Sequence, residues 1–348
     1  MFKRKKYTIA ALIIFLLLGL CTGCGKASDE ASKEEASIDV FAMDTYMTFT
    51  AYGEHAEEAL QEAEEEILRL DELWSVGKET SEISRLNKEG SGTVSAETIQ
   101  LLTCAKEISE ETKGAFDLTI YPLMELWGFT TQVYQVPEET KIRDIVENHM
   151  GMEHVKIDPE TQTVTLEQQV KIDLGGIAKG YASQQVEKIF QKHGVESGIV
   201  SLGGNIQAIG KKTDGSPWKV GIQPPTENME MAGSYEAEGE AVITSGGYER
   251  YFEEDGTTYH HILDPHTGYS TKQDLLSVTI ISKDGMKADC LSTTLFVLGK
   301  EKAVDYWKNH KEEFDMILID EEENIFISEG IQGKFQSEYP FEIIDERG

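Results

Sequence analysis

The stretch "KIDLGGIAKGYA", residues 171–182, is the most informative single segment for the fold. A strand pattern ends at Asp173, a Gly-Gly pair makes a turn, and a helical pattern then runs to about residue 193. Glycines at such a turn let the backbone approach a ligand closely, and the free N–H groups of a helix start can bind phosphate. Lys179 adds a cation one turn into the helix. The spacing fits neither common nucleotide motif, so a turn without a ligand remains an alternative.

Strand and helix patterns are mixed around this segment without strict alternation, which predicts an α+β fold. The clearest helix has an apolar stripe every three or four residues over 56–74. Further helices are expected at 95–114, 137–151, 177–193, 286–299 and 302–310. Strands are expected at 47–53, 197–204, 205–212, 218–223, 240–246, 259–265 and 275–282, with hairpins at 154–168 and 314–330.

The N-terminus has the pattern of a targeting segment. A basic cluster precedes an apolar run that is too short for a comfortable membrane span, and Gly23 then precedes Cys24 as in a bacterial lipobox. We therefore expect a lipoprotein signal peptide over 1–23, a lipid on Cys24, a flexible polar tether over 24–37 and a folded domain over 38–348. This predicts a lipid-anchored protein on the extracytoplasmic face of the cell membrane. Plain secretion and an uncleaved anchor remain alternatives.

The composition excludes some partners. The formal charge of the chain is -31 and its pI is near 4.6, so its surface repels nucleic acid. Two cysteines remain in the folded part, Cys104 and Cys290, and their apolar neighbours favour buried free thiols over a disulfide. In the folded part neither a Cys-x-x-Cys motif nor a His/Cys cluster suggests zinc.

Several loops carry residues suited to binding a ligand. Gly-Gly pairs follow strand patterns at 175–176, 203–204 and 246–247, which suggests loops that gather around one extended ligand. The run "GAFDLTIYPLMELWGF", residues 114–129, is an aromatic-rich loop that could pack a core or wall a flat ring. In "YHHILDPHTG" only one of the adjacent His260 and His261 can face a site, and His261 is the better candidate for a base.

The stretch "MKADCLSTTLFVLG", residues 286–299, places Asp289 and Thr293 one turn apart on a helix. Helix capping is the common explanation for such residues near a helix start. The alternative is a metal site, because Mg²⁺ takes about six oxygens, commonly from one or two carboxylates and substrate phosphates. A carboxylate, a hydroxyl and a backbone carbonyl from a glycine turn would suit it.

These pieces together resemble the ApbE family, the FAD:protein FMN transferases. The matching stretches come in the family's order over about residues 41 to 300, and they are "MDTYMTF", "SEISRLN", "GAFDLTIYPLMELWGF", "IDLGGIAKGYA", "VSLGGNIQAIG", "ITSGGYERYF", "HHILDPHTGY" and "ADCLSTTLFVLG". The ordered set is specific, whereas no single member is. Two departures stand out: Gly77 occupies a position where many members have Tyr, and some members have an acid in place of Lys179.

The resemblance implies an α+β, T-fold-like structure of two lobes with FAD in the cleft between them. It implies an FAD site lined by Met43, Ala115, Phe116, Asp117, Asp173, Lys179 and Leu263. It also implies Mg²⁺ held by the carbonyl of Gly176 and the side chains of Asp289 and Thr293.

The implied reaction is phosphoryl transfer. A Ser or Thr hydroxyl of an acceptor protein attacks the phosphorus on the FMN side of FAD, and AMP leaves. His261, or Asp289 through the metal shell, would take the hydroxyl proton. The family's acceptor site resembles Ser/Thr-Gly-Ala-Ser/Thr, which does not occur in this sequence, so we expect a separate extracytoplasmic acceptor protein. FAD hydrolysis to FMN and AMP, a non-catalytic flavin-binding lipoprotein, and a structural lipoprotein without a ligand remain alternatives.

Overall fold

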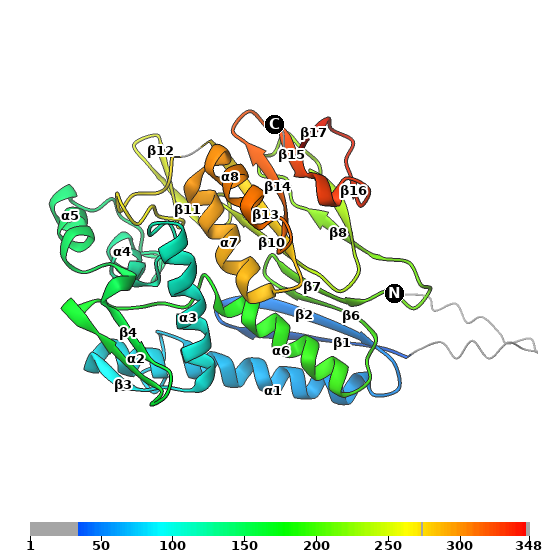
Figure 1. Ribbon diagram of the computed structural model, residues 1–348, viewed down its shortest axis with the longest axis horizontal. Helices are drawn as coiled ribbons and strands as arrows, with labels where there is room; N and C mark the ends of the chain where they lie inside the picture. The colour runs from blue at the N-terminus through cyan, green and yellow to red at the C-terminus, as the bar shows by residue number, and fades with distance from the viewer. Residues whose placement is uncertain (1–33, 273, 346–348) are drawn as a thin grey trace, which may run out of the picture. The chain divides into compact units, whose positions relative to one another are not determined.

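The computed structural model describes residues 34–272 and 274–345 (Figure 1). The predicted signal peptide, the lipid site at Cys24 and the tether up to residue 33 lie outside the described residues. Within those ranges, none of the helices has the length and apolar character needed to cross a membrane.

A nine-stranded sheet forms the centre, and its neighbouring strands pair antiparallel except β15 with β17. Its order is β1-β2-β6-β7-β10-β13-β14-β15-β17. The strands are β1 (Glu35–Ala42), β2 (Thr45–Tyr52), β6 (Ser197–Leu202), β7 (Asn205–Gly210), β10 (Ala241–Gly246), β13 (Leu275–Ser282), β14 (Asp315–Asp320), β15 (Ile325–Ser328) and β17 (Phe341–Ile344).

Both faces of this sheet are covered, because apolar residues occupy successive positions along its inner strands. Ile243 and Ile280 belong to the core under the helices, whereas their neighbours Val242 and Ile281 belong to a second core on the other face. The helices in front of the sheet in Figure 1 are α1 (Ala56–Trp74), α6 (Ala178–Lys192), α7 (Gly285–Leu298) and α8 (Lys300–His310). A small sheet of β8 (Trp218–Ile222), β9 (Gly233–Ala237) and β16 (Phe335–Gln336) packs on the opposite face.

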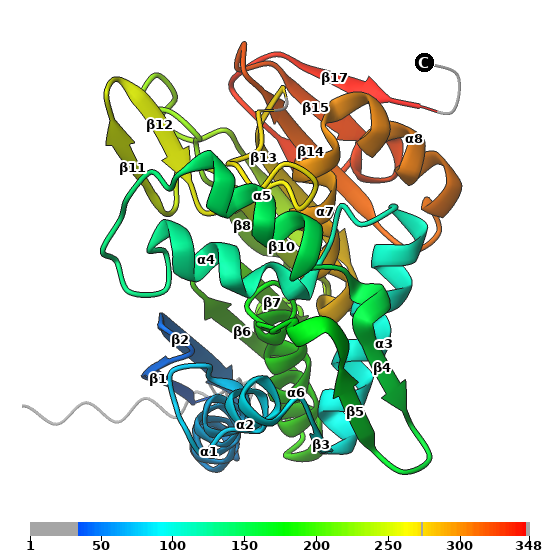
Figure 2. The ribbon, with the colours of Figure 1, turned by 90° about the vertical axis from the view of Figure 1, so that its left-hand side faces the viewer.

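A second group of elements lies beside one end of the sheet. Helices α4 and α5 lie at the left of Figure 1 and in front of the central strands in the turned view of Figure 2. The group comprises α2 (Glu82–Glu89), β3 (Ser91–Thr93), α3 (Ala96–Glu111), α4 (Tyr121–Trp127), α5 (Glu139–Asn148), β4 (Val155–Asp158) and β5 (Thr163–Leu166). A two-stranded ribbon, β11 (Tyr251–Glu254) and β12 (Thr257–His260), completes the fold with short 3₁₀ turns at Leu118–Ile120, Met152–His154, Glu167–Gln169 and Glu329–Ile331.

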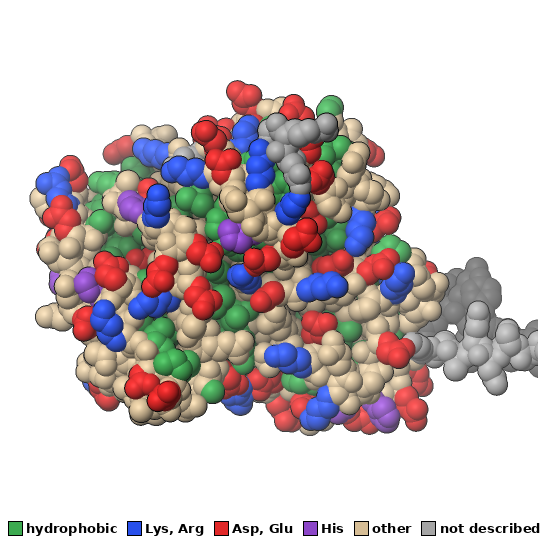
Figure 3. Space-filling view, viewed as in Figure 1, with side chains coloured by type: hydrophobic (Ala, Val, Ile, Leu, Met, Phe, Trp, Pro, Cys, Tyr) green, Lys and Arg blue, Asp and Glu red, His purple; other side chains and the backbone are tan. Residues whose placement is uncertain are grey.

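Most expected elements are present. The stripe predicted for residues 56–74 is α1, and its stripe residues are buried. Cys104 and Cys290 are buried free thiols, as expected. The acidic side chains are spread over the face shown in Figure 3, in keeping with the charge of the chain.

Three expectations need correction. Strand β1 starts at Glu35, so the tether cannot extend to residue 37; as an edge strand, β1 keeps its polar residues exposed, which made them resemble linker. The run 114–129 is not a loop throughout, because it contains the 3₁₀ turn and α4. The strand expected over 259–265 ends at His260, where the chain bends before a turn closed by Asp264.

Candidate functional site

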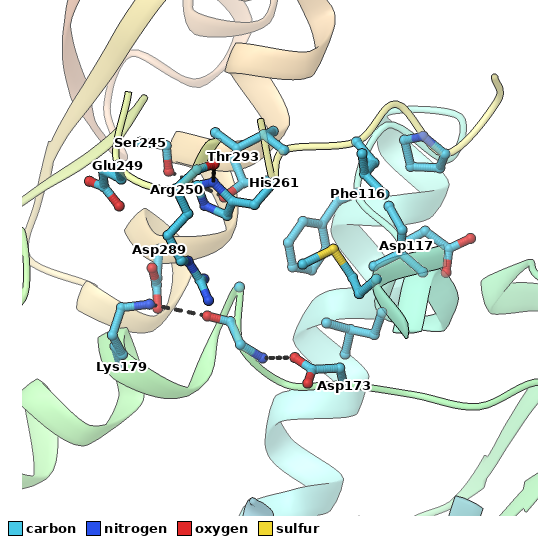
Figure 4. Close-up of a pocket in the computed structure, with 18 of the residues that line it drawn as sticks. Phe116, Asp117, Asp173, Lys179, Ser245, Glu249, Arg250, His261, Asp289 and Thr293 are labelled. Atoms are coloured by element: carbon cyan, nitrogen blue, oxygen red, sulfur yellow. Dashed lines mark hydrogen bonds between the residues drawn. The ribbon is translucent and has the colours of Figure 1, made fainter. Parts of the chain in front are cut away.

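A central pocket of about 150 Å³ lies where the glycine turns, α7 and the loop before α4 meet. We call it the central pocket. Ten of the expected site residues line it: Ala115, Phe116, Asp117, Asp173, Gly176, Lys179, His261, Leu263, Asp289 and Thr293. Asp289, Lys179 and Arg250 lie together on one side, and Phe116, Asp117 and Asp173 lie on the other (Figure 4).

Met43, the remaining expected residue, lines a smaller pocket of about 100 Å³ next to the central one. The two pockets share Asp173 and Gly175 and therefore adjoin each other. Met43 adopts a φ of 51° in the tight β1–β2 turn, and its N–H donates to Asp71 at 3.0 Å. Trp74 lines this pocket too, three residues before Gly77, where many family members have Tyr.

Helix α7 presents Asp289 and Thr293 to the central pocket, and neither caps it. The N-cap is Asp284, whose side chain accepts from the N–H of Lys287 at 3.0 Å. The capping explanation is therefore wrong for Asp289, which lies in the second turn with only 4% of its surface exposed. A buried carboxylate that is not a cap needs another source of stabilisation.

Part of that stabilisation comes from helix α6. The N–H of Gly180 donates to Asp289 Oδ2 at 2.8 Å. Gly180 is the third residue of α6, so its N–H is one of the donors at a helix start that have no partner within the helix. Among the described residues no hydrogen bond ends on the Gly176 carbonyl, and Gly176 lines the same pocket as Asp289. A carbonyl oxygen without a hydrogen bond therefore lines the same pocket as a buried carboxylate.

These groups fit a divalent cation that prefers oxygen ligands. The Thr293 hydroxyl lies 3.2 Å from the Ser245 hydroxyl, which in turn lies 2.8 Å from that of Ser292. Asp289, Thr293 and the Gly176 carbonyl are the donor types that Mg²⁺ takes, and they provide only part of its usual six ligands. Within the described ranges no group of three or more His, Cys, Asp or Glu forms a metal cage, so a substrate would have to complete the shell.

Two cations face this half-shell. The Lys179 ammonium donates to the carbonyl of Gly175 at 3.1 Å, and Arg250 extends into the pocket beside Asp289 (Figure 4). Among the described residues neither cation forms an ion pair. Arg250 was missed by the sequence reasoning, although its segment "ITSGGYERYF" was among the matching stretches. Unpaired cations in a pocket of this acidic protein favour an anionic ligand such as a diphosphate.

His261 is held as a neutral base candidate. Its backbone N–H donates to the Arg250 carbonyl at 3.0 Å, and its ring Nδ1 lies 3.3 Å from the same oxygen. Because a carbonyl can only accept, Nδ1 carries the proton and Nε2 keeps a free lone pair. Burial, followed by the nearby Arg250 guanidinium, lowers the pKa of His261 to about 3. Its neighbour His260, the last residue of β12, faces a different pocket.

Asp117 and Asp173 shape the loops on the other side. Asp117 caps the 3₁₀ turn by accepting from the N–H and the hydroxyl of Thr119 at 2.7 and 2.6 Å. Its carboxylate points away from Asp289 (Figure 4), and burial raises its pKa to about 6. Asp173 accepts from the N–H of Gly175 at 2.5 Å, which fixes the glycine turn, and burial raises its pKa as well.

Two further pocket residues had no signal of their own in the sequence. The Asn205 amide nitrogen is buried without a hydrogen-bond partner, and it stands directly after the Gly203–Gly204 turn. Glu249 precedes Arg250, and burial raises the pKa of its carboxyl. An orphaned donor at the pocket is a group that a bound substrate would satisfy.

Comparison with known proteins agrees with this site. The model of the ApbE family matches residues 43–318. The chain is 36% identical over 267 residues to the FAD:protein FMN transferase of Klebsiella pneumoniae, covering 75% of this chain and 82% of the relative. It is 30% identical over 310 residues to that of Escherichia coli K12, covering 85% and 86%.

Solved structures of ApbE proteins have the same fold as this chain. The ApbE protein of Thermotoga maritima superposes with a TM-score of 0.81 at 33% identity, covering 87% of this chain and 100% of that one. The flavin transferase ApbE of Vibrio cholerae gives 0.78 at 26% identity, covering 87% and 99%. By its sequence, its fold and the content of its central pocket, the chain belongs to the ApbE family of flavin transferases.

Proposed function

We propose that this protein transfers FMN from FAD to a Ser or Thr hydroxyl of a separate acceptor protein, with Mg²⁺ bound and AMP released. The observation that carries the proposal is the meeting of three features in one pocket: the Asp289–Thr293–Gly176 oxygen half-shell, two unpaired cations and a neutral imidazole with a free lone pair. The names of the relatives support the flavin donor and the protein acceptor.

Different residues of the site would bind different parts of FAD. Lys179 and Arg250 face the position where a diphosphate would complete the oxygen half-shell, and each can neutralise part of its charge. The two neighbouring pockets would together form an extended binding surface for FAD. Phe116 would lie beside the ring systems, on the side away from the cations. Bound Mg²⁺ would supply charge neutralisation at the reacting phosphate and would fix its orientation.

The transfer step balances without any further reactant. The acceptor oxygen forms a bond to the phosphorus of the FMN half, the bond from that phosphorus to the bridging oxygen breaks, and AMP carries that oxygen away. His261 Nε2 accepts the proton of the attacking hydroxyl. Its low pKa makes it a weak base in the free protein. The negative charge of a bound diphosphate would act in the opposite direction and raise that pKa.

The test is AMP release from FAD by the soluble domain, with Mg²⁺ and with EDTA, with and without a small protein carrying a Ser-Gly-Ala-Thr site. AMP that appears only with Mg²⁺ and acceptor, together with an acceptor heavier by one FMN, is the expected result. AMP without acceptor would establish hydrolysis. Bound FAD with no AMP under any condition would leave a flavin carrier and overturn the proposal.

We also propose that the mature chain begins at Cys24 and is anchored by lipid on the extracytoplasmic face of the membrane. The basic cluster, the apolar run and the Gly23–Cys24 junction support this. Full-length protein should partition into the detergent phase of a Triton X-114 extract, and Cys24→Ser should move it to the aqueous phase. Equal partitioning of both proteins would contradict the lipid anchor.

A further inference from the structure

Three hydroxyl groups form a connected row beside the metal half-shell. The Thr293 hydroxyl lies 3.2 Å from that of Ser245, and the Ser245 hydroxyl lies 2.8 Å from that of Ser292. The Ser292 hydroxyl then donates to the backbone carbonyl of Asp289 at 2.9 Å. The row therefore begins and ends at the two residues of α7 whose side chains belong to the half-shell, and it passes through strand β10 between them.

Strand β10 brings Ser245 to this position because successive side chains of a strand alternate between the two faces of the sheet. Ile243 belongs to the core under the helices, so Ser245, two residues further along, faces the same helices. Ser245 also lines the central pocket, on the same side as Asp289 and Thr293 (Figure 4). Its hydroxyl therefore contacts α7 at the edge of the site.

The direction of these hydrogen bonds follows from the number of protons. Each hydroxyl has one proton to donate, and a carbonyl oxygen can only accept. The Ser292 proton is used on the Asp289 carbonyl, so Ser245 must donate to Ser292. The Ser245 proton is then used as well, and Thr293 must donate to Ser245. Only this arrangement of protons satisfies all three contacts.

This direction decides what the Thr293 oxygen presents to the pocket. Because its proton points to Ser245, both lone pairs of Thr293 Oγ1 stay available to a cation, whereas a proton turned toward the metal would repel it. Without Ser245 the hydroxyl would be free to rotate, and it would have the Asp289 carboxylate one turn away on the same helix as a competing acceptor. Ser292 is fully buried, so water cannot replace it at the far end of the row.

We propose that Ser245 is a positioning residue of the metal site, which holds the Thr293 hydroxyl in the orientation that accepts a cation. The inference rests on the proposed function, because Mg²⁺ belongs to that proposal. Ser245 acts through Thr293, and Ser292 acts through Ser245. The residues that set the affinity for Mg²⁺ therefore extend beyond its direct ligands.

Three substitutions in the row test this role. Ser245→Ala removes the acceptor of the Thr293 proton, and Ser245→Thr keeps a hydroxyl at the same position. Ser292→Ala leaves Ser245 without its acceptor, so that Ser245 is free to donate to Thr293 and reverse the bond between them.

Ser277→Ala is the matched control. Ser277 lies opposite Gly246 on the neighbouring strand β13 and does not line the central pocket. Among the described residues its buried hydroxyl has no hydrogen-bond partner, so its removal breaks no row. For each variant, calorimetry gives the Kd for Mg²⁺ with saturating FAD and without acceptor protein. FAD affinity without Mg²⁺ and urea unfolding are measured separately.

Ser245→Ala and Ser292→Ala should each raise the Kd for Mg²⁺ about tenfold or more, as expected for partners that orient a metal ligand. Ser245→Thr and Ser277→Ala should stay within about threefold of the wild type. FAD affinity without Mg²⁺ and the urea midpoint should not change in any of the four. A Kd of Ser245→Ala equal to that of Ser277→Ala would overturn the assignment, and so would an equal loss in Ser245→Thr, because packing would then explain it.

The proposed function is judged by a different signal, the transfer of FMN to an acceptor. If the wild type binds Mg²⁺ and transfers no FMN, the proposed function fails, and the Kd values alone decide the role of Ser245. If the wild type binds no Mg²⁺ in the presence of FAD, the role of Ser245 is overturned, whether or not FMN is transferred.

Discussion

The carboxylate of Asp289 accepts the N–H of Gly180 at 2.8 Å, and this bond joins α7 to α6 inside the central pocket. The helices approach this closely because residue 180 has no side chain. A Cβ added there would lie 2.2 Å from the Gly285 carbonyl oxygen and 2.6 Å from Asp289 Cβ. One glycine therefore allows the close approach by which α6 holds the carboxylate of Asp289.

Gly180→Ala should force the two helices apart. We expect a loss of about 1–3 kcal/mol in the free energy of unfolding, as for other overpacked cores, and weaker Mg²⁺ binding. Urea unfolding and Mg²⁺ titration measure the two effects. Gly92→Ala is the matched control, because nothing lies within 4 Å of the Cβ it would add. Equal stability of the two variants would refute the close contact.

Asp289→Asn separates charge from shape. The amide oxygen can still accept from Gly180, so the free energy of unfolding should change little, while Mg²⁺ binding and AMP release should fall about 100-fold or more. Asp284→Ala should do the reverse: losing the cap of α7 should cost about 1 kcal/mol of stability and leave Mg²⁺ affinity unchanged. Full turnover by Asp289→Asn would show that this carboxylate is not a ligand of the metal.

Local sequence patterns predicted the elements of the fold and singled out the glycine turn, His261, Asp289 and Thr293, whereas the family resemblance supplied the set of FAD-binding residues. The stripe in α1 and the glycine turn at 175–176 depend on neighbours in the sequence, and periodicity records such neighbours directly. The bond between Gly180 and Asp289 joins residues 109 positions apart, and no periodicity encodes it. A carbonyl ligand from a glycine turn was suggested by the residues, and its assignment to Gly176 came from the family resemblance.

Other structural features were not predicted, because the residues that form them have simpler explanations in the sequence. Arg250 lies in the stretch "ITSGGYERYF", which was interpreted through its two glycines. A single arginine in a loop is usually solvated and so gave no signal of its own. A pocket lined by Tyr248, Tyr251, Tyr259 and Tyr269 gathers residues from β11, β12, α7 and the loop after Tyr269, and each tyrosine alone would be interpreted as core or surface. Strand β1 was missed at its start because an edge strand needs only one apolar face.

His261→Gln tests the assignment of the base. The amide preserves the size and polarity of the side chain and cannot take up a proton, so kcat should fall about 100-fold or more while FAD affinity stays the same. His266→Gln is the control, since His266 is exposed and does not line the central pocket. A kcat within about twofold of the wild type would assign the proton to another acceptor.

Arg250→Gln should act on binding. Its backbone carbonyl, which orients His261, is retained, while the guanidinium that faces the diphosphate position is lost. We expect FAD affinity to fall about tenfold or more, the range for one charge-assisted contact of about 1.5–3 kcal/mol. Equilibrium binding of FAD with Mg²⁺ present is the measurement. Unchanged FAD affinity with a reduced kcat would mean that Arg250 stabilises only the transition state.

The raised pKa of Asp117 predicts a pH dependence of stability in the protein without flavin. The pKa of this carboxyl is about 6 in the folded state against 3.8 when unfolded, so the folded state binds the proton more tightly. The cost of ionising the buried group therefore appears as pH rises from about 4 to 6 and is fully present above that range. Asp117→Asn removes this cost and can still accept from the Thr119 N–H.

The stability of Asp117→Asn relative to the wild type should accordingly improve by about 1 kcal/mol between about pH 5 and pH 7.5, measured by urea unfolding at each pH. For Asp158→Asn the difference from the wild type should instead stay constant over this pH range, because a pKa below 3.8 keeps Asp158 ionised throughout it. Asp158 is exposed, and hydrogen bonds from Thr161 hold its pKa below the ordinary value, so its ionised form stabilises the folded state and is lost on substitution. A difference for Asp117→Asn that is constant with pH would mean that its carboxyl is hydrated in the folded protein.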